Sequence, residues 1–357
     1  MASGIWIDKE LSSKVLTIGC KYMPPRGGIA QVLWNYDNLI FEEFKFIENS
    51  RKSNVGINLI IALWALFKLF LKLLSDKKIK MLHIHTASEI SFKRSTFFLM
   101  VGKLFGKKVV MHIHGGGFEK YYNAHKEFVI KNLKKCDKII SLSQDWVDFY
   151  SSIGFESACV ENVIPEPILM QSNKADNLVH MLYLGLIVER KGIYDLLEVL
   201  SNHRQEFEGK VFLHIGGNGE VEKLLKMIKQ NNLDSFVKFE GWVDNKKKVE
   251  LLNLCDVFVL PSYIEGLPLS VVEALSYNMA VISTRVGGIP SIVRDDENGM
   301  LFNAGDTKGL YNALRALALD TDKLKRFQEA KNNDIDNFYP ESVSKKLMAI
   351  YNSILLK

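Results

Sequence analysis

Two acidic residues with seven residues between them, Glu265 and Glu273, are the first candidates for chemistry in this chain. The run 257–260 before them is short, apolar and partly β-branched, which predicts a buried parallel strand. A Gly-Leu-Pro turn follows, and Ser270 opens a predicted helix. Glu265 therefore falls on a strand-to-helix turn at the carboxyl edge of a sheet, where open α/β sheets bind their ligands.

Glu273 also has a structural explanation. Ser270 and Glu273 have the spacing of a capping box, in which the glutamate satisfies a backbone amide at the start of a helix. Glu265 has no comparable explanation, and we expect its carboxylate to be exposed. Exposed polar residues that a rigid scaffold holds on loops are disproportionately functional. The sequence thus favours a functional role for Glu265 and leaves both roles open for Glu273.

Two stretches predict contacts to phosphate. Arg190 and Lys191 precede Gly192, where a helix is expected to begin, and Gly27 and Gly28 start another predicted helix. Helix N-termini attract phosphate through free amides and the helix dipole, and a lysine adds a full charge. The structural alternative for Arg190 and Lys191 is a solvated pair of cations on a loop.

Two His-Ile-His triplets, 83–85 and 112–114, each end a predicted strand. Residues two apart share one face of a strand, so a four-histidine metal site is conceivable. Half of these histidines fall within apolar runs, and we predict no metal. His114 differs from the others because three glycines follow it at the carboxyl edge of the predicted sheet.

The elements that position these residues alternate between short apolar runs and helix-length periodic segments, which is typical of parallel sheets with crossover helices. The predicted strands are 15–20, 81–84, 108–113, 138–141, 179–184, 211–215, 237–239, 257–260 and 280–283. The predicted helices of the first half are 29–41, 55–74, 95–105 and 120–135. Residues 216–219 predict a turn.

The pattern predicts two Rossmann-like domains, at residues 1–165 and 178–339. Pro165, Pro167 and the polar stretch 171–177 predict a linker between them. Residues 340–357 predict a last helix that begins at Pro340. With 357 residues and 47% hydrophobic content, the chain suits two domains of ordinary size.

Composition narrows the location and the partners. Four scattered cysteines without a C-x-x-C pair predict neither a disulfide framework nor a zinc site, and no secretory signal is expected at the start, which favours the cytoplasm. Residues 1–165 carry 23 lysines and arginines against 15 acidic residues. The basic residues are dispersed and match no nucleic-acid motif, so an anionic membrane surface or a phosphorylated acceptor is the preferred partner.

The segment 55–74 raises the question of a membrane directly. Its uninterrupted apolar run ends at Lys68, short of the ~20 residues that span a bilayer. Lys68 and Lys72 lie four residues apart and predict an amphipathic helix. We expect this helix to pack on the sheet, and an in-plane membrane helix is the alternative.

Seven further segments accompany the two glutamates in a fixed order. They read PPRGGIAQV (24–32), VVMHIHGGGF (109–118), LYLGLIVERKGIYDLLEVL (182–200), IGGNGEVEKLL (215–225), FEGWVDN (239–245), VGGIPSIV (286–293) and ENGMLF (297–302). Together they resemble the retaining glycosyltransferases of family 4. The HIHGGGF and ERKGIYDLLE wording is similar to that of bacterial capsule and exopolysaccharide transferases.

The resemblance implies roles for individual residues. Glu273 would bind the ribose hydroxyls of the donor, Glu265 the donor sugar, and His114 the distal hydroxyl of that sugar or the transition state. Leu186 stands where many relatives have an arginine for the diphosphate, so Arg190 is the candidate replacement. The implied catalytic residues are His114, Glu265 and Lys191, and the implied donor-binding residues are Gly27, Gly28, Arg190, Lys191, Gly217, Asn218, Trp242, Val243, Glu265, Gly266, Leu267 and Glu273.

The resemblance also implies an α/β chain of the GT-B fold, with two Rossmann-like domains facing a central cleft. The helix at 340–357 would cross back to the first domain. The expected activity is transfer of a sugar from a nucleotide-sugar donor to a lipid-linked glycan acceptor, with retention at the anomeric carbon, in cell-surface polysaccharide synthesis. Neither a metal nor another cofactor is expected. Peripheral contact with the inner face of the membrane is expected. Two alternatives stay open: a non-catalytic subunit of a transferase complex, and a sugar-nucleotide epimerase on the same scaffold.

Overall fold

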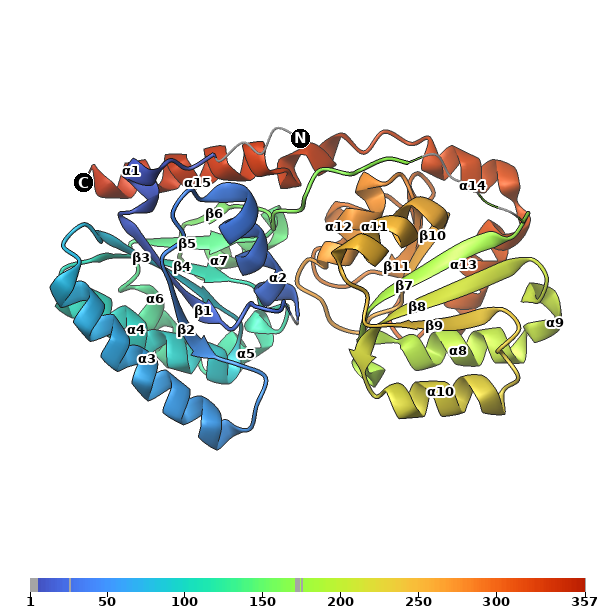
Figure 1. The fold of residues 1–357 in the computed structure, drawn as a ribbon, viewed down its shortest axis with the longest axis horizontal. Coiled ribbons are helices and arrows are strands. Elements are labelled where there is room, and N and C mark those ends of the chain that lie inside the picture. The colour runs from blue at the N-terminus through green and yellow to red at the C-terminus, as the bar shows by residue number, and fades with distance from the viewer. Residues whose placement is uncertain (1–5, 26, 171–173, 175, 357) are drawn as a thin grey trace. The chain divides into compact units, whose positions relative to one another are not determined.

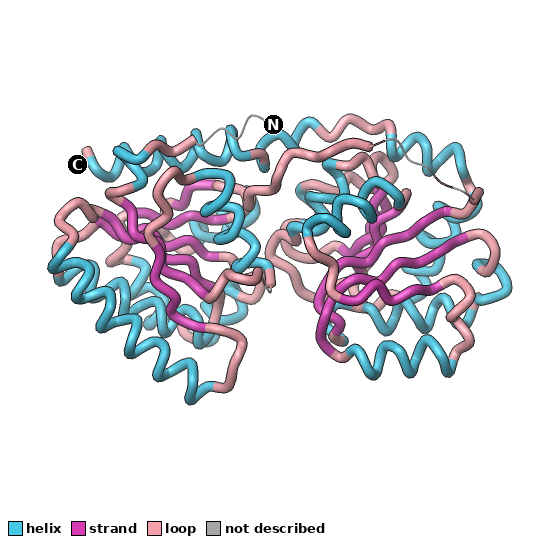
Figure 2. The backbone as a smooth tube through the Cα atoms, in the orientation of Figure 1, coloured by secondary structure: helices cyan, strands magenta, loops and turns pink. Residues whose placement is uncertain are grey.

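The computed structural model describes residues 6–25, 27–170, 174 and 176–356. The chain divides into two compact units: unit 1 comprises Met1–Pro165 and Asp336–Lys357, and unit 2 comprises Glu166–Ile335. Each unit holds a six-stranded parallel sheet between helices (Figures 1 and 2), so the predicted α/β class with two Rossmann-like sheets is confirmed. Of the predicted linker, residues 171–173 and 175 lie outside the described part of the chain.

The sheet of unit 1 has the strand order β2-β1-β3-β4-β5-β6. Its strands are β1 (Val15–Cys20), β2 (Phe46–Ser50), β3 (Met81–Thr86), β4 (Lys108–Ile113), β5 (Lys138–Ser141) and β6 (Ser157–Cys159). Its helices are α1 (Lys9–Ser12), α2 (Gly28–Asn35), the π-helix η1 (Tyr36–Ile40), α3 (Val55–Ser75), α4 (Glu89–Leu104), α5 (Phe118–Ala124), α6 (Lys126–Leu133), α7 (Gln144–Ser152) and α15 (Pro340–Leu355).

The two faces of this sheet differ in chemistry because side chains alternate along a strand. Leu82 and Ile84 of β3 belong to an apolar core formed with α3 and α4. His83 and His85 point to the opposite face, where the hydroxyl of Tyr351 shares a hydrogen bond of 2.7 Å with Nδ1 of His83. Helix α15 therefore packs against the histidine-bearing face of unit 1.

The sheet of unit 2 has the strand order β12-β11-β10-β7-β8-β9. Its strands are β7 (Val179–Ile187), β8 (Val211–Gly219), β9 (Val237–Gly241), β10 (Val257–Leu260), β11 (Ala280–Thr284) and β12 (Gly299–Phe302). Its helices are η2 (Glu189–Lys191), α8 (Ile193–Asn202), α9 (Arg204–Phe207), α10 (Val221–Gln230), α11 (Asn245–Leu254), α12 (Leu269–Ser276), η3 (Ile289–Ser291), α13 (Thr307–Leu319) and α14 (Thr321–Gln328); η4 (Asn333–Phe338) begins in unit 2 and ends in unit 1.

Several predicted elements need correction. The helix expected at 120–135 is two helices, α5 and α6, that meet at His125, and the helix expected at 29–41 continues as a π-helix after Asn35. Residues 216–219, expected as a turn, extend strand β8, because their backbones pair with residues 184–187 of β7. Strands β2, β6 and β12 were not predicted; all three are short and lie toward the sheet edges.

Candidate functional site

The strand order of unit 2 reverses between β7 and β10, which are hydrogen-bonded neighbours although 69 residues separate their ends. At such a switch point the following connections diverge to opposite faces of the sheet and leave a crevice at the carboxyl edge. Lys191 lies just after β7, and Glu265 lies just after β10. The topology therefore brings together the two residues that the sequence singled out separately.

Lys191 and Glu265 form an ion pair between Nζ and Oε1, and Ser262 Oγ donates a hydrogen bond of 2.7 Å to the same carboxylate oxygen. The side chain of Glu265 is only 9% exposed and that of Lys191 16%. The expectation of an exposed Glu265 carboxylate was wrong, because the cation delivered by the neighbouring strand covers it. Burial raises the pKa of Tyr183 beneath the pair, and the Glu265 charge raises it further.

Gly192 permits this close approach of the two loops. Its φ is 69°, and a Cβ at this position would lie 1.9 Å from the carbonyl oxygen of Pro261 at the end of β10. Only glycine fits both conditions. Gly192 also precedes α8 without a side-chain cap, so the first amides of this ten-residue helix have no competing side-chain acceptor there. A phosphate beside Lys191 would meet both the ammonium and these amides.

Glu273 is placed differently from the prediction. Helix α12 starts at Leu269, after Pro268, and no side chain caps it, so the capping box of Ser270 and Glu273 is absent. The buried Glu273 carboxylate instead pairs with Lys248 of α11, with Nζ and Oε1 at 2.5 Å. Its structural role is therefore an ion pair between two helices, and its predicted contact to a ribose is untested.

The remaining predicted donor-binding residues of unit 2 lie at or beyond the carboxyl ends of β8, β9 and β10. Gly217 and Asn218 lie at the end of β8; a Cβ at Gly217 would fall 1.9 Å from the carbonyl oxygen of Gly185 on β7, so glycine is required there. Trp242 is 52% exposed after β9, and Val243 packs beside Gly216. The Gly266 carbonyl accepts a 2.5 Å hydrogen bond from the Gly288 amide, while Leu267 is buried.

Arg190 lies in the 3-10 turn η2 and is exposed. Its carbonyl accepts a hydrogen bond of 2.9 Å from the amide of Tyr263, which ties this turn to the loop that carries Glu265. Leu186, which stands where many relatives have an arginine, is half-buried and is the second-last residue of β7. The proposed replacement of that arginine by Arg190 stays a prediction.

Unit 1 contributes the predicted residues His114, Gly27 and Gly28. Gly27 and Gly28 are exposed at the start of α2, which has no side-chain cap, and a Cβ at either position would meet open space. His114 follows β4 and is partly exposed; its Nε2 shares a hydrogen bond of 2.9 Å with Nδ1 of His85. Desolvation by the surrounding side chains lowers the pKa of His114 to about 3, and a side-chain hydrogen bond with Asn162 opposes that shift.

All four histidines of the two triplets stack on one face of the sheet of unit 1. Nε2 of His83 and Nδ1 of His112 share a hydrogen bond of 3.2 Å. His83, His85 and His112 could offer nitrogens within 4.8 Å of one another, yet several of these nitrogens already bond within the stack. Nε2 of His85 and Nε2 of His112 have no partner among the described residues, so a metal would have to use these two atoms.

The histidine stack predicts acid sensitivity of unit 1. Burial lowers the pKa of His83 to about 3 and holds the pKa values of His85 and His112 well below their ordinary value. Below pH 6.5 the unfolded chain binds protons at these sites and the folded chain does not, so stability present above pH 6.5 is lost as the pH falls. His83 alone accounts for about 2 kcal/mol between pH 8 and pH 5.

We expect the urea concentration at the midpoint of unit 1 unfolding to decrease when the pH is lowered from 8 to 5. Tryptophan fluorescence is a suitable probe, because four of the five tryptophans, Trp6, Trp34, Trp64 and Trp146, belong to unit 1. His203→Gln in unit 2 is the control and should keep the wild-type pH profile. A midpoint for unit 1 that is constant over this range would show that the stack accepts protons without cost.

Sequence reasoning missed two side chains of this site. Lys248 neutralises Glu273 from a run of three lysines in which nothing distinguishes it by sequence. Ser262 contacts Glu265 directly, and its position immediately after the strand-ending Pro261 is a signal that could have found it. A separate open cavity of about 670 Å³ in unit 2, lined by charged residues such as Arg294 and Lys325, shares none of the site residues.

The model of one protein family, described as glycosyl transferases group 1, matches residues 166–334. Among curated proteins, the chain is 32% identical over 147 residues to the lipopolysaccharide core biosynthesis glycosyltransferase LpsE of Rhizobium meliloti, covering 41% of each chain. It is 26% identical to the amylovoran biosynthesis glycosyltransferase AmsK of Erwinia amylovora, over 60% of this chain and 55% of that one. The matches thus span about half the length of these relatives.

Among solved structures, the chain resembles HepE of Anabaena in complex with UDP and glucose. The TM-score is 0.73 at 14% identity, covering 95% of this chain and 99% of the other. At that identity the likeness concerns the fold, and it agrees with the two Rossmann-like sheets described above.

Proposed function

Because residues 166–334 match the family model of the glycosyl transferases of group 1, we propose that this chain transfers a sugar from a nucleotide-sugar donor to a glycan acceptor. The observation that carries the proposal is the ion pair of Lys191 and Glu265 at the switch point of the unit 2 sheet. This pair places a cation that can bind a phosphate beside a carboxylate that can accept hydrogen bonds from sugar hydroxyls, at one edge of the crevice. The relatives act in the synthesis of lipopolysaccharide core and amylovoran, as their names state, which supports a role in cell-surface polysaccharide synthesis.

The proposed binding of the donor diphosphate depends on the positive charge beside α8. Lys191 and the uncapped start of α8 would bind the diphosphate and stabilise the charge that accumulates on it as it leaves. Binding of the diphosphate draws Lys191 away from Glu265, and the carboxylate then needs new donors. Hydroxyls of the transferred sugar supply them. The ion pair of Lys191 and Glu265 would thus be replaced by a contact of Lys191 to the diphosphate and a contact of Glu265 to the sugar of the same donor.

The bond changes of the proposed transfer balance without a protein nucleophile. The bond between the anomeric carbon and the diphosphate oxygen breaks, and a bond from that carbon to the acceptor oxygen forms on the same face. The proton of the acceptor hydroxyl goes to a phosphate oxygen of the leaving group. This route retains the anomeric configuration and requires no metal, since the ammonium and amides stabilise the leaving charge.

A nucleotide-release assay tests the proposal. UDP-sugars are the first donors to try, since HepE was solved with UDP and glucose. We expect release of nucleoside diphosphate that requires both donor and acceptor. An epimerase would convert the donor without releasing nucleotide, and a non-catalytic subunit would do neither. NMR of the product linkage then decides between retention and inversion.

The same assay tests metal independence. Activity is expected to persist in excess EDTA, because the proposed stabilising groups are Lys191 and backbone amides. Inhibition by the chelator that zinc or another divalent metal reverses would instead point to Nε2 of His85 and Nε2 of His112. In that case the His85→Gln variant should lose the metal, whereas His203→Gln should keep it.

The acceptor is proposed to be a lipid-linked oligosaccharide, and the chain is proposed to act in the cytoplasm at the inner face of the membrane. The support is the charge of residues 1–165, which carry 23 basic and 15 acidic residues. No nucleic-acid partner is proposed.

A further inference from the structure

Helix α3 exposes many apolar side chains on the surface of unit 1. It packs on the sheet and on α4 through one narrow stripe formed by Ala62, Ala65, Leu69 and Leu73. The side of the helix opposite that stripe is apolar as well: Ile60 is 68% exposed and Trp64 55%. A surface helix of a soluble domain ordinarily presents polar residues there. The prediction that α3 packs on the sheet therefore accounts for the buried stripe of the helix and does not account for its exposed apolar side.

The neighbouring helix α4 extends this apolar surface. Its exposed side chains at helical spacing are Ile90, Phe97, Met100 and Leu104, and Leu104 is 80% exposed. Helices α3 and α4 pack side by side on the same face of the sheet (Figure 1), joined by the edge-to-face pair of Phe70 and Phe105. The exposed members of this apolar face are Val55, Ile57, Leu59, Ile60, Leu63, Trp64, Phe67, Phe70, Leu71, Leu74, Ile90, Phe97, Met100 and Leu104.

The size of the apolar face requires an explanation. Its exposed side chains amount to on the order of 1,000 Å², whereas the largest apolar patch of a typical monomer is ~300–600 Å². By length and composition alone, helix α3 is long and apolar enough to cross a membrane when Lys68 and Lys72 are included, although its uninterrupted apolar run ends at Lys68 as predicted. It is nevertheless held flat along β2 and α4, with 22% of its most apolar stretch buried.

The charged residues of helix α3 have one sign. Helix α3 contains no Asp or Glu, and its charged residues are Lys68 and Lys72. Lys68 lies over the ring of Trp64, with Nζ 5.6 Å from the ring centroid. A tryptophan and lysines beside an apolar helix face are typical of the interface between hydrocarbon and lipid headgroups.

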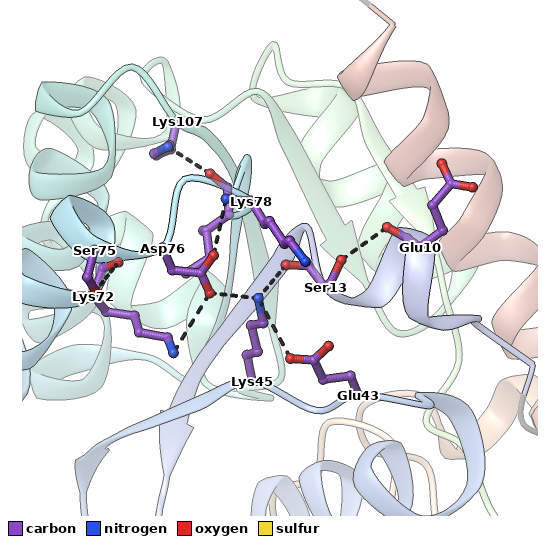
Figure 3. Close-up of polar contacts among 10 residues, drawn as sticks. Glu10, Ser13, Glu43, Lys45, Lys72, Ser75, Asp76, Lys78 and Lys107 are labelled. Carbon is purple, nitrogen blue, oxygen red and sulfur yellow. Dashed lines mark hydrogen bonds and ion pairs between the residues drawn. The ribbon is translucent and has the colours of Figure 1, made fainter.

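The C-terminal end of α3 adds further basic residues. Asp76 lies 2.7 Å from Lys45 and 3.8 Å from Lys72, so this carboxylate is already paired with two cations (Figure 3). Lys107 donates a 2.7 Å hydrogen bond to the Ile79 carbonyl beside it. Burial lowers the pKa of Lys107, and the charges of Lys80 and Lys77 lower it further, which shows how closely these cations gather.

We propose that the apolar face of α3 and α4 inserts in the plane of a lipid bilayer with anionic headgroups, as a monotopic anchor. Hydrocarbon would cover the apolar side chains, and the lysines at its flank and end would bind headgroup phosphates. A second copy of this chain fits less well. A two-fold contact through the same face would bring Lys68 and Lys72 of both copies together, and α3 carries no acidic residue to pair with them. The inference deepens the proposed function, since a lipid-linked acceptor resides in such a membrane.

Vesicle flotation of the full chain tests the anchor without donor or acceptor, so its failure is distinguishable from failure of the proposed function. We expect binding to phosphatidylcholine vesicles with about 30% phosphatidylglycerol, partly retained in about 0.5 M salt, because insertion is not screened as charge is. The triple variant Ile60→Ser, Phe67→Ser, Leu71→Ser should bind at least ten-fold more weakly at both low and high salt. Lys68→Gln should weaken binding at low salt only.

Controls separate insertion from unfolding and from self-association. The matched variant Leu169→Ser, Leu225→Ser, Leu319→Ser changes three exposed apolar residues of unit 2 and should float like the wild type. Trp64 should show a blue-shifted emission on vesicles that Trp64→Phe removes. Wild-type binding by the folded triple variant would overturn the proposal. So would a dimer of the wild type in detergent-free solution that the triple variant converts to monomer.

Discussion

Replacement of Glu265 by glutamine is expected to lower turnover by roughly 10²- to 10³-fold, the usual cost of losing one charge-stabilising group in a transition state. Glutamine keeps the shape and one acceptor oxygen of the carboxylate, so Ser262 retains its partner. The charge that faces the sugar and Lys191 is removed. Affinity for the free nucleoside diphosphate should stay the same or rise, because Lys191 is released from its counter-ion.

The glutamine variant is preferred to alanine for a structural reason. Breaking a partly buried ion pair by truncation leaves the other charge without its partner, which can cost about 3–5 kcal/mol. Ser262→Ala is the matched control, since it removes one hydrogen bond to the carboxylate but keeps its charge, and it should lower turnover by at most about ten-fold. Wild-type turnover by Glu265→Gln, with its thermal midpoint unchanged, would remove Glu265 from the mechanism.

Replacement of Lys191 by methionine is expected to weaken nucleoside diphosphate binding by roughly 10- to 100-fold, as expected for hydrogen bonds to a charged group. Turnover should fall further, since the ammonium meets more negative charge on the leaving diphosphate than on the bound donor. Calorimetry with UDP measures the first effect and initial rates with a UDP-sugar the second. Methionine is similar to lysine in length and has an apolar stem, so this substitution removes mainly the charge.

Two variants around Lys191 show how specific its role is. Arg190→Gln should weaken diphosphate binding if Arg190 replaces the arginine absent at Leu186, and Leu186→Arg should then restore it. In the double variant Lys191→Met, Glu265→Gln, the losses should not add, because the two side chains act as one pair. Binding of UDP by Lys191→Met with wild-type affinity would contradict the assignment of the phosphate site.

Much of the fold could be predicted because parallel strands buried on both faces are short, apolar and bounded by polar residues. Strands β1, β4, β5 and β10 have the predicted bounds for this reason. Strands β2 and β6 did not carry that signal: β2 includes Glu48 and Asn49, and β6 has three residues. Edge strands are buried less, so their sequences are less constrained.

The sequence by itself determined which residues carry chemistry: Glu265 after an apolar strand, Lys191 before a glycine and a helix, and the four histidines at alternating positions. Local spacing sets the face and the end of the element on which each residue lies. Resemblance of several motifs in one order also indicated the fold. These features depend on short segments of backbone, and such segments are encoded locally.

Only the tertiary structure decided which of these residues meet. Lys191 and Glu265 form a pair because strand order makes β7 and β10 neighbours, and Glu273 meets Lys248 because two helices pack together. Exposure was decided in the same way: α3 is apolar on every side but one flank, and the sheet covers only one stripe of it. Burial and pairing between residues distant in sequence depend on what the rest of the chain places against them, which no local pattern records.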